Sequence, residues 1–157
     1  MHKILLSLLL FLWAVLGWTI DSAEPNITVI EPWIREAPPG AKALAGYMLI
    51  YNHGDTDVEL ISASSPDFDT VMLHETIERS KMVTMVRLDR VGIPMQERIA
   101  FEPGGKHLML MRPKRALAVG EESTVILMFA GDVKVAAKFK VQKPFLDDPK
   151  AKGKKRH

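Results

Sequence analysis

Short apolar runs separated by turn residues make up most of the chain after residue 23, and no segment there keeps a helical period. The runs are rich in Val, Ile, Leu and Met. Groups such as Pro38-Pro39-Gly40 and Pro103-Gly104-Gly105 lie between them, and Pro and Gly favour turns through their backbone geometry. The pattern predicts strands over residues 27–33, 43–52, 58–63, 70–77, 82–88, 98–101, 106–111, 123–129 and 133–141.

Many short strands at this spacing indicate an all-β domain, built as an antiparallel sandwich or barrel. The length of 157 residues leaves room for one such domain. The domain is expected to occupy residues 24–143, with a separate segment at each end.

The first segment, residues 1–23, has the features of a secretory signal peptide. Lys3 supplies a positive charge, residues 4–20 are almost all apolar, and the small residue Ala23 offers a cleavage position. An uncleaved membrane anchor is the alternative, because such a run is at the lower end of the roughly 17 to 25 residues that span a bilayer. Both alternatives place the domain outside the cytoplasm, in the periplasm.

The last segment, residues 144–157, is expected to be a disordered basic tail. Residues 149–157 carry five Lys and Arg and no acidic residue, a composition typical of disordered tails. Because the whole chain has a net charge of only +2, the body without this tail is slightly acidic. The tail either keeps the chain soluble or contacts anionic lipid head groups or an acidic partner. A slightly acidic body in an exported protein argues against nucleic acid as a partner.

Composition excludes several classes of site. The chain has no Cys, so it has no disulfide, no thiolate zinc site, no thiol nucleophile and no blue-copper centre. It also lacks the Gly-x-Ser-x-Gly, His-Glu-x-x-His and phosphate-loop motifs. These observations predict that the protein is not an enzyme.

Alternation along the predicted strands brings out four residues with metal-binding side chains. His107 and Met109 share one face of their strand while Leu108 and Leu110 share the other, which is the expected core side. His74 likewise lies opposite the aliphatic face of its strand, and the strand that carries Met85 follows a turn. Two imidazoles and two thioethers form a soft, neutral donor set, and thioether sulfur selects for Cu(I).

The same residues resemble the metal motif of the periplasmic copper chaperones of the PCu(A)C type, which is His, ten residues, Met, twenty-one residues, His, one residue, Met. His74, Met85, His107 and Met109 match it position for position. The flanking segments 33–48, 74–76 and 103–111 are also similar to the family. One departure is that Ile77 and Glu78 stand where many relatives have a further Met.

The resemblance implies a cupredoxin-like Greek-key β-barrel that binds copper outside the cytoplasm. It further implies delivery to the copper centre of cytochrome c oxidase, with an oxidase subunit or a thiol-containing assembly factor as the copper-accepting partner. Two alternatives share the predicted fold: an exported β-sandwich interaction module without metal, and a copper storage or resistance protein. The other methionines at positions 72, 82, 111 and 128 are expected to pack in the core or at its rim, with Met111 the best candidate among them for a sulfur just outside the ligand set. Trp33 is expected in the core.

Overall fold

The structure is a computed structural model, and it describes residues 26–80 and 82–144. The predicted signal peptide and all of the predicted basic tail beyond Pro144 lie outside the described residues. Within them, no helix is long and apolar enough to cross a membrane.

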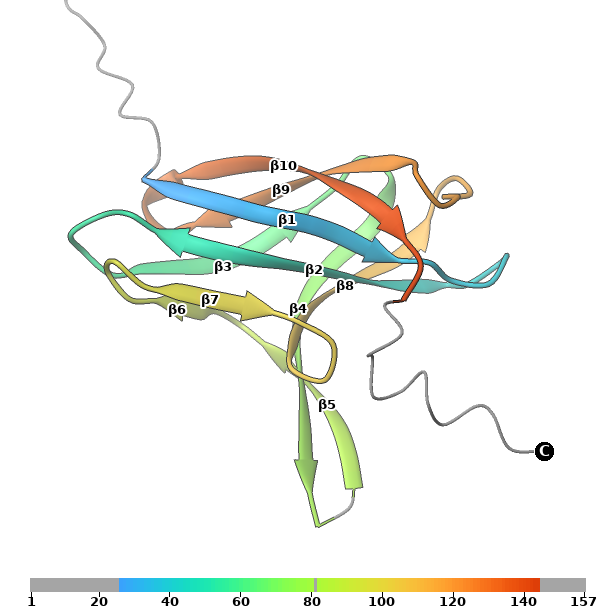
Figure 1. Cartoon of the computed structure of the whole chain (residues 1–157), viewed down its shortest axis with the longest axis horizontal. Coiled ribbons are helices and arrows are strands. Elements are labelled where there is room, and N and C mark those ends of the chain that lie inside the picture. The colour runs from blue at the N-terminus through green and yellow to red at the C-terminus, as the bar shows by residue number, and fades with distance from the viewer. Residues whose placement is uncertain (1–25, 81, 145–157) are drawn as a thin grey trace, which may run out of the picture.

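A closed ring of strands forms the body of the molecule (Figure 1). Going round the ring, the order is β4-β8-β2-β1-β10-β9-β3, and the register pair Ala63–Val71 joins β3 back to β4. The ring strands are β1 (Ile27–Arg35), β2 (Ala43–Asn52), β3 (Val58–Ser64), β4 (Phe68–Arg79), β8 (Lys106–Pro113), β9 (Glu122–Phe129) and β10 (Lys134–Gln142). This arrangement confirms the all-β barrel that the sequence predicts.

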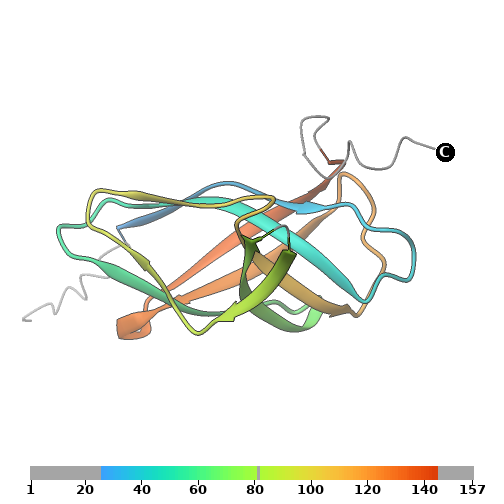
Figure 2. The ribbon, with the colours of Figure 1, turned by 90° about the horizontal axis from the view of Figure 1, so that it is seen from below.

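Three further strands are attached to the ring. They are β5 (Met82–Leu88), β6 (Val91–Ile93) and β7 (Arg98–Phe101), which pair with β4, β3 and β2. A 3-10 turn, η1 (Ala130–Asp132), links β9 to β10. The hairpin of β4 and β5 extends away from the barrel (Figure 1), and it lies in front of the barrel when the molecule is seen from below (Figure 2). β5 is exposed along nearly its whole length.

One pairing differs from the expected antiparallel arrangement. β1 and β10 are parallel, with Trp33 opposite Lys140. Parallel neighbours need a long connection, and here almost the entire domain lies between the two strands. A bulge between Ile30 and Trp33 shifts the register of β1 against β2, so β1 bends where it meets β10.

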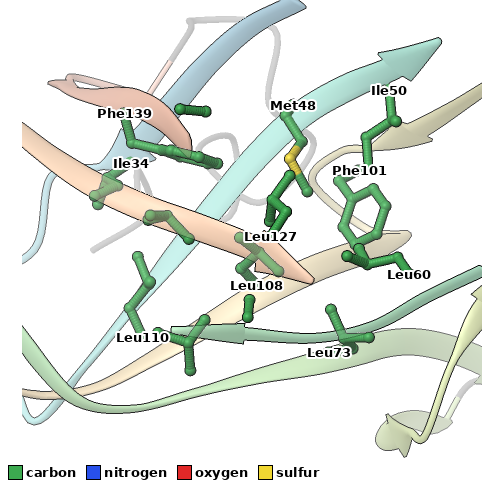
Figure 3. Packing of buried hydrophobic residues seen from close by; sticks show 14 of the residues in the cluster. Ile34, Met48, Ile50, Leu60, Leu73, Phe101, Leu108, Leu110, Leu127 and Phe139 are labelled. Carbon is green, nitrogen blue, oxygen red and sulfur yellow. The ribbon is translucent and has the colours of Figure 1, made fainter. Parts of the chain in front are cut away.

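The core lies inside the ring, where one face of each strand is buried (Figure 3). On β8, Leu108 and Leu110 are fully buried, and Leu73 on β4 packs into the same cluster. Gly46 on β2 faces them, and a Cβ there would lie 3.3 Å from Leu110. Because these leucines point inward, His74, His107 and Met109 must lie on the outer face of the wall.

Candidate metal centre

The four predicted ligands come from three neighbouring strands, in the order β5, β4, β8. His74 on β4 is directly opposite His107 on β8. Met109 follows His107 by two positions on β8, and Met85 precedes Arg87, the direct partner of His74 on β5, by two positions. Met109 and Met85 are therefore diagonal neighbours of His74. Direct partners lie about 5 Å apart and diagonal ones roughly 7 to 8 Å. His74 therefore neighbours each of the other three predicted ligands.

The two histidine rings are close enough to share one metal ion. Their centroids are 5.9 Å apart and the rings meet edge to face. A metal bonded to an imidazole nitrogen at roughly 2 Å lies about 3 Å from the ring centre. The separation of the two rings therefore matches that of two imidazoles bonded to one ion.

A turn in the backbone fixes which nitrogen of His107 is free. The Nδ1 of His107 lies 3.1 Å from the carbonyl oxygen of Gly105, which can only accept a hydrogen bond, so Nδ1 carries the proton. The lone pair is then on Nε2, the arrangement in which a backbone carbonyl orients a ligating imidazole. His107 is 5% exposed, so its ring is held in place.

One ring nitrogen of His74 has no hydrogen-bond partner among the residues that the structure describes. Its Nδ1 is buried and has no hydrogen-bond partner, although buried polar atoms are nearly always paired. Burial lowers the pKa of His74 by desolvating the charged ring, and electrostatic interactions with His107 and with the positive charge of Arg87 lower the pKa further. A neutral imidazole with an unsatisfied nitrogen fits a metal ligand.

The two thioethers lie in different settings. Met109 is half-buried on the barrel wall, whereas Met85 is 51% exposed on the projecting hairpin. A half-buried thioether and an exposed one thus lie on the two sides of the histidine pair. This arrangement allows a metal ion to be bound from the wall and reached from solvent.

Charged ligands do not complete this site. Within residues 26–80 and 82–144, no three His, Asp or Glu side chains cluster as they would around a metal. The nearby carboxylate of Glu75 already forms a salt bridge with Lys106 at 2.9 Å. The remaining donors are therefore neutral sulfur atoms, which suit a soft monovalent ion better than zinc or a hard cation.

An aromatic pair lies beside His107, with Tyr47 nearer to its ring and Trp33 packed on Tyr47. Tyr47 lies 6.4 Å from His107 between ring centroids, and Trp33 lies 4.6 Å from Tyr47. Trp33 was expected in the core, and this expectation is wrong: its ring is half-buried on the outer wall. The bulge in β1 precedes Trp33, and a bulge changes which face the following side chains occupy.

Comparison with known proteins identifies the family of the chain. Residues 27–141 match the family described as "Putative lipoprotein LpqE-like". The chain belongs to this LpqE-like family. A "Putative lipoprotein" of Leifsonia xyli subsp. xyli is 30% identical over 106 residues, which are 67% of this chain and 63% of that protein. An uncharacterized protein of Rickettsia prowazekii is 26% identical over 123 residues, 76% of this chain and 68% of that one. The chain therefore spans less than two thirds of the Leifsonia protein.

Solved structures similar to this member of the LpqE-like family include PCuAC domains. The copper-bound PCuAC domain from PmoF2 has a TM-score of 0.66 and 28% identity, covering 78% of this chain and 97% of that domain. The solution structure of CuI-DR1885 from Deinococcus radiodurans has a TM-score of 0.64 and 26% identity, covering 82% and 87%. These matches confirm the resemblance to the PCu(A)C family and its cupredoxin-like fold.

Sequence reasoning missed two features of the centre. The carbonyl of Gly105 orients His107, and the only signal was the Pro-Gly-Gly turn before the ligand pair. Met72 lies on the outer face with His74, opposite Met109, although packing in the core or rim was expected. The alternation of Val71 and Leu73 with Met72 and His74 already carried that signal. Met82, also expected to pack, is 69% exposed.

Proposed function

We propose that this domain binds one Cu(I) ion through His74, Met85, His107 and Met109, outside the cytoplasm, and passes it to a partner protein. The domain is taken as residues 24–143, after a signal peptide or anchor at 1–23. The observation that supports the proposal most is the histidine pair: two imidazoles in direct register, 5.9 Å apart, with an unsatisfied buried nitrogen on His74. The copper-containing neighbours support the choice of metal.

The neutral donors favour exchange over permanent retention. Thioethers and imidazoles bring no negative charge, so a bound Cu(I) keeps its positive charge and attracts an anionic or thiolate acceptor. The exposed Met85 is where an incoming donor can replace a ligand first. The protein's own part is to hold the ion and release it by ligand exchange, without catalysing a reaction.

The receiving partner in this proposal is the copper centre of cytochrome c oxidase, reached through an oxidase subunit or a thiol-containing assembly factor. An acceptor that offers thiolates would bind Cu(I) more strongly than thioethers do. Mixing the loaded protein with the copper-free oxidase domain should transfer copper in one direction. Copper that stays on this protein in the presence of that acceptor would favour storage.

An anaerobic Cu(I) titration against a chromophoric chelator tests the binding. The wild-type chain from Glu24 onward should hold one tight equivalent, and the variant with His74→Ala and His107→Ala should lose it. His53→Ala is the matched control, because His53 is exposed and its ring bonds Thr28 rather than the centre. An interaction module without metal predicts that the double variant changes stability alone, with no copper retained by either protein.

A further inference from the structure

Met72 is placed like a ligand rather than like a packing residue. It lies on β4 two positions before His74, on the same outer face, while Val71 and Leu73 are buried on the other face. Its direct partner across β4–β8 is Met109. Both methionines are half-buried on the wall of the barrel.

Together with the histidines, these two methionines form a rectangle on two paired strands. His74 is opposite His107, and Met72 is opposite Met109. Partners across strands lie about 5 Å apart, and like-facing residues along a strand lie roughly 7 Å apart. Two imidazoles and two thioethers therefore project from one compact area that excludes the hairpin strand β5.

Met85 lies on the opposite side of the histidine pair from Met72. Its direct partner on β4 is Thr76, four positions beyond Met72, which corresponds to about 13 Å along the strand. An ion held between the histidine rings can therefore take a second sulfur from the hairpin side or from the wall side. The hairpin sulfur is exposed, and the wall sulfur is half-buried.

We propose that Met72 is a further Cu(I) ligand, which replaces Met85 when a partner engages the hairpin. The exchange breaks the bond between copper and the Met85 sulfur and forms one to the Met72 sulfur. Copper stays Cu(I), and no proton moves because a thioether carries none. The inference rests on the proposed function, and it explains how the ion keeps two sulfur ligands while its exposed side becomes free for an acceptor.

Leucine substitutions test the inference, because Leu removes the sulfur at nearly constant volume. The set is Met72→Leu, Met85→Leu, the double variant, and the control Met128→Leu on β9, whose side chain is also half-buried and whose strand is separated from β4 by β3. X-ray absorption of the Cu(I)-loaded proteins counts the sulfur ligands, and chelator competition gives the affinities. Thermal unfolding verifies that each variant is folded.

The expected result is that the Met85→Leu protein keeps two sulfur ligands and the double variant keeps one. The affinity loss of the double variant should exceed the product of the two single losses by about tenfold, since each sulfur substitutes for the other. In the Met85→Leu protein, the methyl NMR signal of Met72 should shift when Cu(I) is added.

Two results would overturn the inference, and they differ from a failure of the proposed function. One is a single sulfur ligand in Met85→Leu. The other is a Met72→Leu substitution that leaves the Cu(I) affinity unaltered, both in the wild-type protein and in the Met85→Leu protein. In either case, copper binding that still depends on His74 and His107 leaves the proposed function intact. If the wild-type protein bound no Cu(I), both the inference and the proposed function would be contradicted.

Discussion

The carbonyl oxygen of Gly105 accepts a hydrogen bond from Nδ1 of His107 at 3.1 Å, and the backbone N–H of Thr76 donates to the same oxygen at 3.0 Å. One backbone atom thus joins β4 to the loop before β8 and sets the tautomer of a proposed ligand. Gly104, with φ of +90°, allows the turn that aims this carbonyl, because side chains rarely tolerate that conformation. The Pro-Gly-Gly segment therefore acts on the metal centre through the backbone.

Replacement of Gly104 by Ala tests this role. A Cβ at Gly104 meets no neighbour, so the cost is backbone strain of about 1 kcal/mol or more. The free energy of unfolding, measured with denaturant, should fall by this amount, and the Cu(I) affinity should fall with it because the His107 ring loses its fixed position. Gly92→Ala is the control: it also has open space, without the positive φ. Equal effects of the two substitutions would contradict the role given to the turn.

The pKa of His74 gives a prediction for the copper-free protein. NMR titration should place this pKa below the ordinary value of 6.5, chiefly because the ring is desolvated. Arg87→Gln removes one nearby positive charge, so it should raise the pKa while leaving it below 6.5. An unchanged pKa in this variant would show that Arg87 does not act on the ring.

The same shift has a consequence for stability. Well above pH 6.5, the ordinary pKa of the group, the His74 ring is neutral in both folded and unfolded chains and contributes no pH dependence. Below it the unfolded chain takes up the proton first, so stability should fall as the pH drops toward the folded pKa. Comparing the pH dependence of the melting temperature in wild type and His74→Gln isolates this contribution. Parallel curves for the two proteins would contradict it.

A charged cluster away from the centre should affect stability without affecting copper. Arg115 donates to Asp67 and to Glu121, and the hydrogen bond from Arg115 is the main reason that the pKa of Asp67 is lowered. Asp67→Asn should cost less than about 1 kcal/mol of unfolding free energy, because Arg115 is 40% exposed. The stabilisation by Asp67 should disappear as the pH falls below about 4, where the carboxylate is protonated in the unfolded chain. A changed Cu(I) affinity in this variant would be unexpected.

The sequence predicted several strands together with their bounds. The bounds of β2, β5 and β7 were predicted correctly, and the outward placement of His74 and His107 followed from their buried neighbours. β6 was missed because it has only three residues with Gly92 in the middle, which is too short for a pattern. The parallel pairing of β1 with β10 could not be predicted, because it depends on how the ring closes and not on either strand alone.

The local details of the centre depend on atoms that a sequence pattern does not describe. The Gly105 carbonyl is a backbone group, and its aim depends on the φ angle of Gly104. The alternation of apolar residues already placed Met72 on the same face as His74. A packing role was nevertheless expected for it, because the chain has nine Met and Met commonly fills protein cores. Its direct pairing with Met109 required the register of β4 against β8.

The most direct test of the proposed centre is nitrogen NMR of the histidine rings with and without one equivalent of Cu(I). The ring nitrogens of His74 and His107 should shift strongly, with the proton of His107 retained on Nδ1, while those of His53 stay in place. Shifts at His53 in place of the pair, or tightly bound copper with His74 and His107 unchanged, would contradict the account.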